Sequence, residues 1–135
     1  MTKIVAVDTN VLLDYRLKRK PTFNMARLLI EDCLNSKIQI FIPSIVFPEL
    51  EWVLRSFYKQ PKELIVRFLE SLLVLEGVLA ENKSAMRNAL SIFSQSNLTF
   101  TDSIILIEIE NFGPDEFLTF DENLKKIYRG ASLQN

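Results

Sequence analysis

The feature that most constrains the fold is the alternation of short apolar runs with longer amphipathic stretches. Ile4–Val7 is continuously apolar, and Ile38–Ile42 contains a single polar residue, Gln39. Such β-branched runs are typical of strands that are buried on both faces. The stretch between them, residues 25–35, carries apolar side chains at helical spacing. Strands that alternate with helices in this way predict an α/β fold, with a mainly parallel sheet flanked by helices.

The remaining elements are expected on the same grounds. Further helices are predicted from Pro61 onward and over residues 9–18, 44–59, 82–94 and 101–112, with Ser44 and Thr101 as N-caps. Further short strands are predicted within Val74–Leu79 and over Phe117–Phe120. The chain has 135 residues and no linker, repeat or low-complexity segment. Residues 1–135 are therefore predicted to form a single domain.

Composition excludes several classes of function. The chain contains no histidine, which removes Ser-His-Asp and Cys-His catalysis and the zinc sites that need imidazole. Cys33 is the only cysteine, so it cannot form an intramolecular disulfide and is expected to be a buried thiol. A net charge of −1 does not fit a general nucleic-acid coating protein. No apolar run approaches the length of a membrane helix, and a cytoplasmic protein is expected.

Two acidic residues directly follow predicted strands. Asp8 comes after Ile4–Val7, and Asp121 comes after Phe117–Phe120. Ligands of parallel sheets bind at the carboxyl ends of the strands, which makes both positions candidates for a functional site. Either residue can instead be a helix N-cap, because Asp is favoured there and a helix-like segment follows each one.

Two other acids are predicted on the apolar sides of helices. Glu49 has apolar residues one turn away in both directions, and Asp102 has them on the two turns that follow it. An acid on an apolar side is costly unless something compensates it, and for Asp102 the helix dipole is an alternative explanation. Glu51 is expected to point the other way and to pair with Arg55 in solvent.

Four partly buried acids in one place would repel one another and take up protons unless cations balanced them. Mg²⁺ and Mn²⁺ prefer oxygen ligands. Two such ions on a carboxylate cluster can activate a water and stabilise the leaving oxygen of a phosphodiester. A chain without histidine can therefore still hydrolyse a phosphodiester.

Four segments resemble, in order, the successive motifs of PIN domains. They are Asp8–Asp14 (Asp-Thr-Asn-Val-Leu-Leu-Asp), Pro43–Leu50, Thr101–Ile105 and Leu118–Asp121 (Leu-Thr-Phe-Asp). The resemblance covers nearly the whole chain, and the length is most similar to VapC-type toxins of toxin–antitoxin pairs. It implies a three-layer PIN-like domain and a metal-dependent endoribonuclease that hydrolyses RNA phosphodiester bonds.

The resemblance also implies roles for single residues. The acids that bind Mg²⁺ or Mn²⁺ in the family fall on Asp8, Glu49, Asp102 and Asp121. The polar position that orients the site by hydrogen bonds falls on Thr9 or Asn10, and the hydroxyl residue that often precedes the last acid falls on Thr119.

The chain departs from the family pattern in two places. The residues after Asp102 are the bulky Ile104–Ile107, where the family usually carries small side chains. This bulk is the basis of an alternative hypothesis, a catalytically inactive PIN-like binding module. Pro48 stands directly before Glu49 and predicts a distorted or late start of that helix. A third hypothesis, a haloacid-dehalogenase-like phosphohydrolase, needs a second acid two positions after the first, where this chain has Asn10.

Basic and aromatic residues indicate how RNA would be held. The densest basic cluster is Arg16, Lys18, Arg19 and Lys20, which Lys125, Lys126 and Arg129 would extend. Such residues position RNA without reading its sequence, and a solvated helix end is the alternative. The rings expected to stack on a base are those of Tyr15, Phe23 and Trp52. For Phe23 and Trp52 the alternative is packing in the core or at an interface. Ten phenylalanines suggest surplus apolar surface, which in the family serves a homodimer and a cognate antitoxin.

Overall fold

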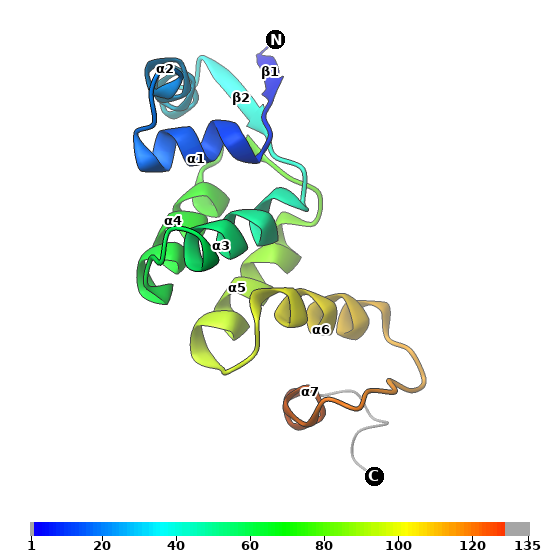
Figure 1. The fold of residues 1–135 in the computed structure, drawn as a ribbon. Helices are drawn as coiled ribbons and strands as arrows, with labels where there is room; N and C mark the ends of the chain where they lie inside the picture. The colour runs from blue at the N-terminus through cyan, green and yellow to red at the C-terminus, as the bar shows by residue number, and fades with distance from the viewer. Residues whose placement is uncertain (1, 129–135) are drawn as a thin grey trace. The chain divides into compact units, whose positions relative to one another are not determined.

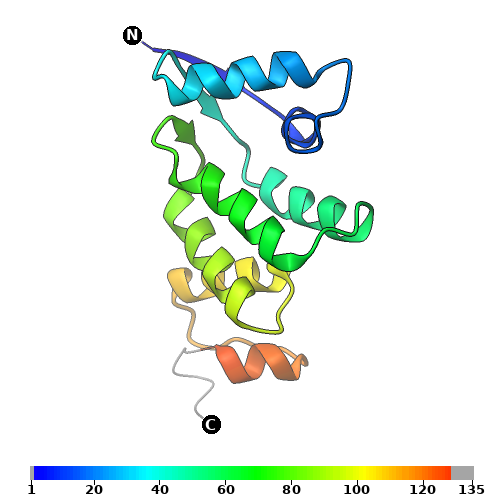
Figure 2. The ribbon, with the colours of Figure 1, turned by 90° about the vertical axis from the view of Figure 1, so that its left-hand side faces the viewer.

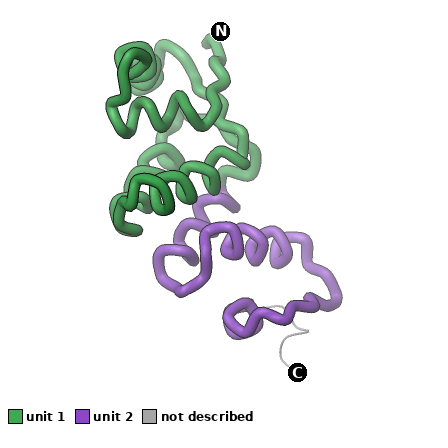
Figure 3. Tube along the Cα trace, viewed as in Figure 1, with its two compact units in different colours: residues 1–83 green, residues 84–135 purple. Residues whose placement is uncertain are grey.

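The structure is a computed structural model that describes residues 2–128. The chain divides into two compact units, residues 1–83 and residues 84–135 (Figure 3). We call them unit 1 and unit 2 and describe each by itself.

Unit 1 contains a parallel sheet with helices between its strands (Figures 1 and 2). The described strands are β1 (Lys3–Ala6), β2 (Ile38–Phe41) and β3 (Val78–Leu79), paired in the order β1-β2-β3. Helices α1 (Thr9–Leu17) and α2 (Phe23–Leu34) connect β1 to β2, and α3 (Val46–Ser56) and α4 (Lys62–Val74) connect β2 to β3. The α/β class and the parallel sheet predicted from the apolar runs are confirmed. The expected burial of both faces is wrong for β1, where Ile4 is 56% exposed.

The core of unit 1 forms where the sheet and the helices bury their apolar sides. Ile40 of β2 is fully buried, as are Leu50 and Leu54 of α3 and Ile65 and Leu69 of α4. Cys33 of α2 is a buried free thiol, as expected, and burial raises its pKa. A buried thiol with a raised pKa is a poor nucleophile, which agrees with a packing role.

Gly77 lies where the backbone before β3 passes very close to α2. A Cβ at this position would stand 2.7 Å from Cys33 Sγ and 3.3 Å from the Cys33 carbonyl oxygen. We expect Gly77→Ala to lower the free energy of unfolding by about 1–3 kcal/mol, the usual cost of overpacking. Urea denaturation measures this cost. The cost of Gly77→Ala should be smaller in a chain that also carries Cys33→Ala, because the sulfur is then absent. An equal cost in the native and the Cys33→Ala chains would contradict the close packing.

The regular elements of unit 2 are all helices over its described residues. It contains α6 (Phe100–Phe112), α7 (Glu122–Ile127) and all but the first residue of α5 (Lys83–Gln95). Its core is built on Leu98, Leu106, Leu124 and Tyr128. The rings of Phe93 and Phe100 also pack together, with centroids 5.5 Å apart. Gly113 ends α6 in the left-handed conformation at φ 73°, as predicted from Gly113-Pro114.

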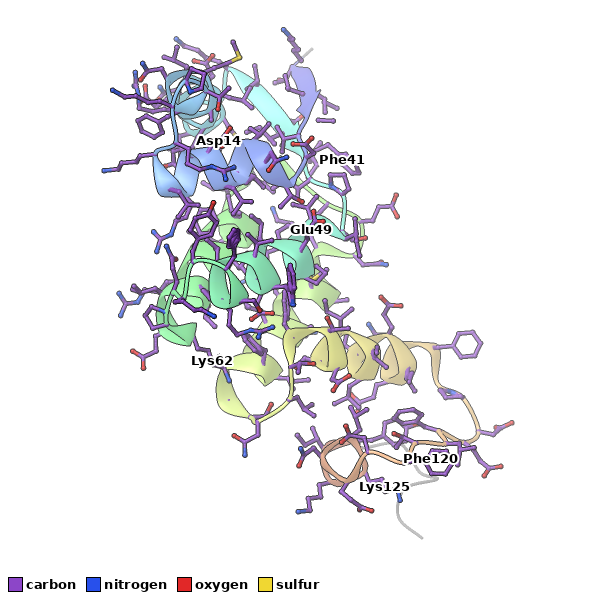
Figure 4. The ribbon with its side chains drawn as sticks, in the orientation of Figure 1. Asp14, Phe41, Glu49, Lys62, Phe120 and Lys125 are labelled. Carbon is purple, nitrogen blue, oxygen red and sulfur yellow. The ribbon has the colours of Figure 1, made fainter. Side chains whose placement is uncertain are left out.

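The strand predicted over Phe117–Phe120 is wrong, because this segment is irregular in the structure. A strand needs a partner for its backbone groups, and the described part of unit 2 contains no strand. Phe117 instead packs its ring on Tyr128 at 5.2 Å. Leu118 and Phe120 are 80% and 88% exposed. Figure 4 shows Phe120 in the segment that leads into α7.

Two predicted N-caps are also wrong. Helix α3 begins at Val46, not directly after Ser44, and Ile45 at its N-cap makes no side-chain capping bond. Pro48 falls in the first turn, where an N–H would have no partner within the helix, so the helix begins at Val46, two residues before the proline. Thr99, not Thr101, caps α6, and its Oγ1 accepts from the Asp102 N–H at 3.0 Å.

No helix among residues 2–128 is both long and apolar enough to cross a membrane.

Candidate functional site

Asp8 is the N-cap of α1 and stands directly after the loop that leaves β1. Its Oδ1 accepts a hydrogen bond from the Val11 N–H at 3.3 Å. The side chain is exposed. A carboxylate offers about four lone-pair sites, so the capping bond leaves acceptor capacity for a ligand. The capping interpretation of Asp8 is therefore confirmed, and it is compatible with a second role.

Glu49 is held by a hydrogen bond that crosses from α1 to α3. The Thr9 hydroxyl donates to Glu49 Oε1. Thr9 is buried, so its hydroxyl provides a fixed donor for the exposed glutamate. In Figure 4, Glu49 lies near the start of α3, close to α1. Between the two orienting positions that the sequence left open, Thr9 makes this contact, whereas the exposed side chain of Asn10 makes no hydrogen bond with the described residues.

The orientations predicted for the acids of α3 are wrong. Glu49 is exposed, whereas Glu51 is 3% exposed and pairs with Arg55 at 2.5 Å. The buried stripe of the helix runs through Val46, Phe47, Leu50, Glu51 and Leu54. This stripe is rotated from the one expected, so it includes Glu51 and leaves Glu49 at the surface. Glu51 is thus a buried acid that sequence reasoning assigned to solvent.

Asp102 and Asp121 each lie at the start of a helix in unit 2. Asp102 is half-buried in the first turn of α6, beside the buried positions Phe100 and Ser103. Asp121 is exposed and caps α7, where its Oδ1 accepts from the Asn123 and Leu124 N–H groups at 2.8 and 3.1 Å. Its own N–H donates to Thr119 Oγ1 at 3.1 Å. The capping interpretation of Asp121 is confirmed, and Thr119 fixes the backbone that carries it.

Each unit supplies two of the four predicted acids. Within residues 2–128, no three or more Asp, Glu or Cys side chains are grouped so as to hold a metal ion. The donor set itself fits Mg²⁺ or Mn²⁺, because it consists of accessible carboxylate oxygens with no imidazole or thiolate among them. The four-carboxylate metal site stays a prediction.

A second polar cluster, which sequence reasoning missed, holds the turn between α1 and α2. Asp14 accepts from Arg19 and from the Thr22 hydroxyl, and Arg19 also donates to the Tyr58 hydroxyl at 2.9 Å. The bond from Thr22 is the main cause of the lowered pKa of Asp14, and Arg19 lowers it further. The pKa of Arg19 is raised by its contacts with Asp14 and Tyr58, against the opposing effect of burial.

The lowered pKa of Asp14 makes its contribution to stability depend on pH. A carboxyl whose pKa is lower in the folded state stabilises the fold above its unfolded value and loses this effect as the pH falls through the folded value. We expect Asp14→Asn to cost at most about 1 kcal/mol at neutral pH, with the difference from the native protein vanishing well below pH 3.8. Denaturation at several pH values measures this. A difference that persists at low pH would contradict the ionic contribution.

Several residues of the predicted basic cluster contact other side chains of the protein and are therefore not fully available to RNA. Arg19 is paired with Asp14 at 2.6 Å, and Arg16 lies over the ring of Phe68. Lys125 is 3.5 Å from Glu122, and Arg129 lies outside the described residues. Among the predicted aromatic contacts, Trp52 is 58% exposed, and Tyr15 and Phe23 line a pocket with Arg16.

Comparisons with known proteins agree with the sequence motifs. The family model of the PIN domain matches residues 5–130, a range that includes all four acids. The VapC ribonuclease of Aquifex aeolicus (strain VF5) is 27% identical over 121 residues, which cover 90% of this chain and 90% of that protein. No solved structure gives a significant match.

Proposed function

Because the chain belongs to the PIN domain family, we propose that it is an endoribonuclease that hydrolyses RNA phosphodiester bonds with Mg²⁺ or Mn²⁺. The observation that carries the proposal is a relative described as a ribonuclease that aligns over 90% of both chains. Four accessible acids at the motif positions support it. We further propose that the chain is the toxin of a type II toxin–antitoxin pair and acts in the cytoplasm.

Asp8, Glu49, Asp102 and Asp121 would hold the metal. When bound, Mg²⁺ or Mn²⁺ supplies Lewis-acid activation of a water and charge stabilisation for the leaving oxygen. The protein's own contribution is to fix its carboxylates. Backbone N–H groups hold Asp8 and Asp121 at their helix starts, and the Thr9 hydroxyl holds Glu49.

Two neutral side chains would assist these acids. Thr119 orients the backbone of Asp121 through its hydroxyl. Asn10 follows Asp8 and Thr9 in the first turn of α1 and is exposed, so its amide is available to an RNA phosphate or to the water that attacks it. Thr119 therefore belongs to the proposed catalytic set as a positioning residue, and Asn10 belongs to it as a residue that would contact the RNA or the water.

Exposed apolar side chains support protein partners. Ile45 and Phe57 of unit 1 and Phe112 of unit 2 are each at least 70% exposed. Large exposed apolar groups are typical of interaction surfaces when they are contiguous. We propose a homodimer and an antitoxin as the partners that cover such groups.

The test is cleavage of purified total RNA by the full chain, with Mn²⁺ in one arm and EDTA in the other. We expect discrete products only with Mn²⁺. In parallel, Mn²⁺ should raise the melting temperature, because a ligand that binds only the folded state stabilises it. No cleavage together with no thermal response would instead support the inactive binding module, whose basis is the bulk of Ile104–Ile107.

A further inference from the structure

A basic pocket lies in unit 1, lined by side chains from three helices. Its volume is about 670 Å³, and α1, α2 and α4 all contribute to it. Pockets of this size accommodate small organic ligands. None of the four proposed metal-binding acids is among the lining residues.

The charge of the pocket is opposite to that of the whole chain. Its lining includes four cations, Arg16, Lys18, Arg27 and Arg67, and one acid, Glu31, whereas the chain carries a net charge of −1. Glu31 forms an ion pair with Arg27 at 2.6 Å. Lys18 and Arg67 form no ion pair within the described residues. The pocket therefore presents uncompensated positive charge to an anion.

Arg16 carries an unsatisfied donor in this pocket. Its guanidinium lies 5.3 Å from the centroid of the Phe68 ring, and one terminal nitrogen is 3.5 Å from Gln60 Oε1. Its Nε is buried and has no hydrogen-bond partner among the described residues. Buried donors are nearly always paired in folded proteins. Because Nε has almost no accessible surface, an anion in the pocket would contact a terminal nitrogen of the Arg16 guanidinium instead.

Aromatic rings in the same pocket indicate which kind of anion the pocket would bind. Tyr15 from α1 and Phe23 from α2 are half-buried lining residues. Rings beside arginines are the usual means of binding a nucleotide, since the base stacks on a ring while the cations hold the phosphate. A nucleotide supplies both matching groups in one unit, a phosphate for the cations and a flat base for the rings.

We propose that this pocket binds one nucleotide of a single-stranded RNA, with its phosphate on Arg16, Lys18 and Arg67 and its base against Tyr15 or Phe23. This inference rests on the proposed function and names a second contact region for the same substrate. It also gives a role to Arg16 and Lys18 of the basic cluster. The other two residues of that cluster, Arg19 and Lys20, do not line the pocket.

The test is RNA binding without cleavage. A short fluorescein-labelled single-stranded RNA is titrated by fluorescence anisotropy against chains that carry Asp8→Asn, in EDTA. We expect Lys18→Gln combined with Arg67→Gln to weaken binding about tenfold, and the slope of log affinity against log salt to fall by about 0.7 per lost phosphate contact. Tyr15→Phe should bind like the parent chain, whereas Tyr15→Ala should bind more weakly.

The matched control is Lys37→Gln combined with Arg87→Gln, which removes the same two charges from exposed positions outside the pocket. An equal loss of affinity for RNA in this control would overturn the proposal, because it would show that RNA responds to positive charge anywhere on the surface and not to the pocket. AMP should displace the RNA, and displacement by polyglutamate at the same concentration of charge would overturn the assignment of a nucleotide. If the chain bound AMP but not RNA, the nucleotide in the pocket would not come from RNA, and that part of the proposal would be overturned.

The two proposals fail in distinguishable ways. A chain whose RNA binding depends on Lys18 and Arg67 but which never cleaves RNA would contradict the nuclease and leave the pocket supported. A chain that cleaves RNA with the same KM after Lys18→Gln and Arg67→Gln would contradict the pocket and leave the nuclease supported. Melting temperatures of every variant in EDTA show whether a loss of binding reflects unfolding.

Discussion

Asp8→Asn should lower the rate of RNA cleavage by more than about 100-fold, because loss of even an outer partner of a metal ligand costs 10–100-fold. The substitution keeps the capping bond, since Asn is as good an N-cap as Asp and its carbonyl oxygen can accept from the Val11 N–H as Oδ1 does. The melting temperature in EDTA should therefore stay unchanged. The rise in melting temperature with Mn²⁺, equivalent to about 2.7 kcal/mol at 100 times the Kd, should be lost.

The matched control is Asp115→Asn, which changes an exposed acid that makes no hydrogen bond or ion pair with the described residues. It should cleave RNA as fast as the native protein. Cleavage by the Asp8→Asn chain at the native rate and at saturating Mn²⁺ would contradict the proposed role of Asp8. Asp121→Asn tests a second proposed metal-binding acid in the same way, because the Asn side chain retains an oxygen that can cap α7.

Arg55→Leu should lower the free energy of unfolding by roughly 2–3 kcal/mol. Glu51 is 3% exposed and is paired with Arg55 at 2.5 Å. Removing one partner of such a pair leaves a buried charge uncompensated, at a cost of about 3–5 kcal/mol when both groups are buried. The side chain of Arg55 is 47% exposed, and solvent therefore reduces the expected cost. Urea denaturation at neutral pH measures it.

The control for this prediction is a double variant, Glu51→Leu with Arg55→Leu. Replacing both members of a buried pair by apolar residues is often neutral or stabilising, so the double variant should be more stable than Arg55→Leu alone. The double-mutant cycle isolates the interaction between the two side chains. A double variant that is less stable than Arg55→Leu would show that the carboxylate of Glu51 stabilises the fold through other contacts.

Local patterns were enough to predict most of the helices and strands. The apolar runs that became β1 and β2 are continuous over several residues, and the helices between them have clear apolar sides and breakers such as Pro61 and Gly113. The capping roles open to Asp8 and Asp121 follow from neighbouring residues alone. These features depend on contacts within a few positions of the chain, which is why the sequence predicts them.

The errors have a different origin. Glu49 and Glu51 are two positions apart, and a modest rotation of the buried stripe of α3 exchanged their expected surroundings. Phe117–Phe120 has the composition of a strand, yet pairing depends on a partner from elsewhere in the chain, and its described unit contains none. The bond from Thr9 to Glu49 joins residues that are 40 positions apart, and no local pattern indicates it.

The sequence by itself determined the α/β class, the buried thiol of Cys33, the family and the four candidate acids, because apolar periodicity and motif order are properties of the chain. Only the tertiary structure decided which acid of α3 is buried, that Thr9 and not Asn10 contacts Glu49, and that α1, α2 and α4 together form a basic pocket. These outcomes depend on how helices rotate and pack against one another. Packing is set by contacts between distant residues, and a short pattern in the sequence does not encode it.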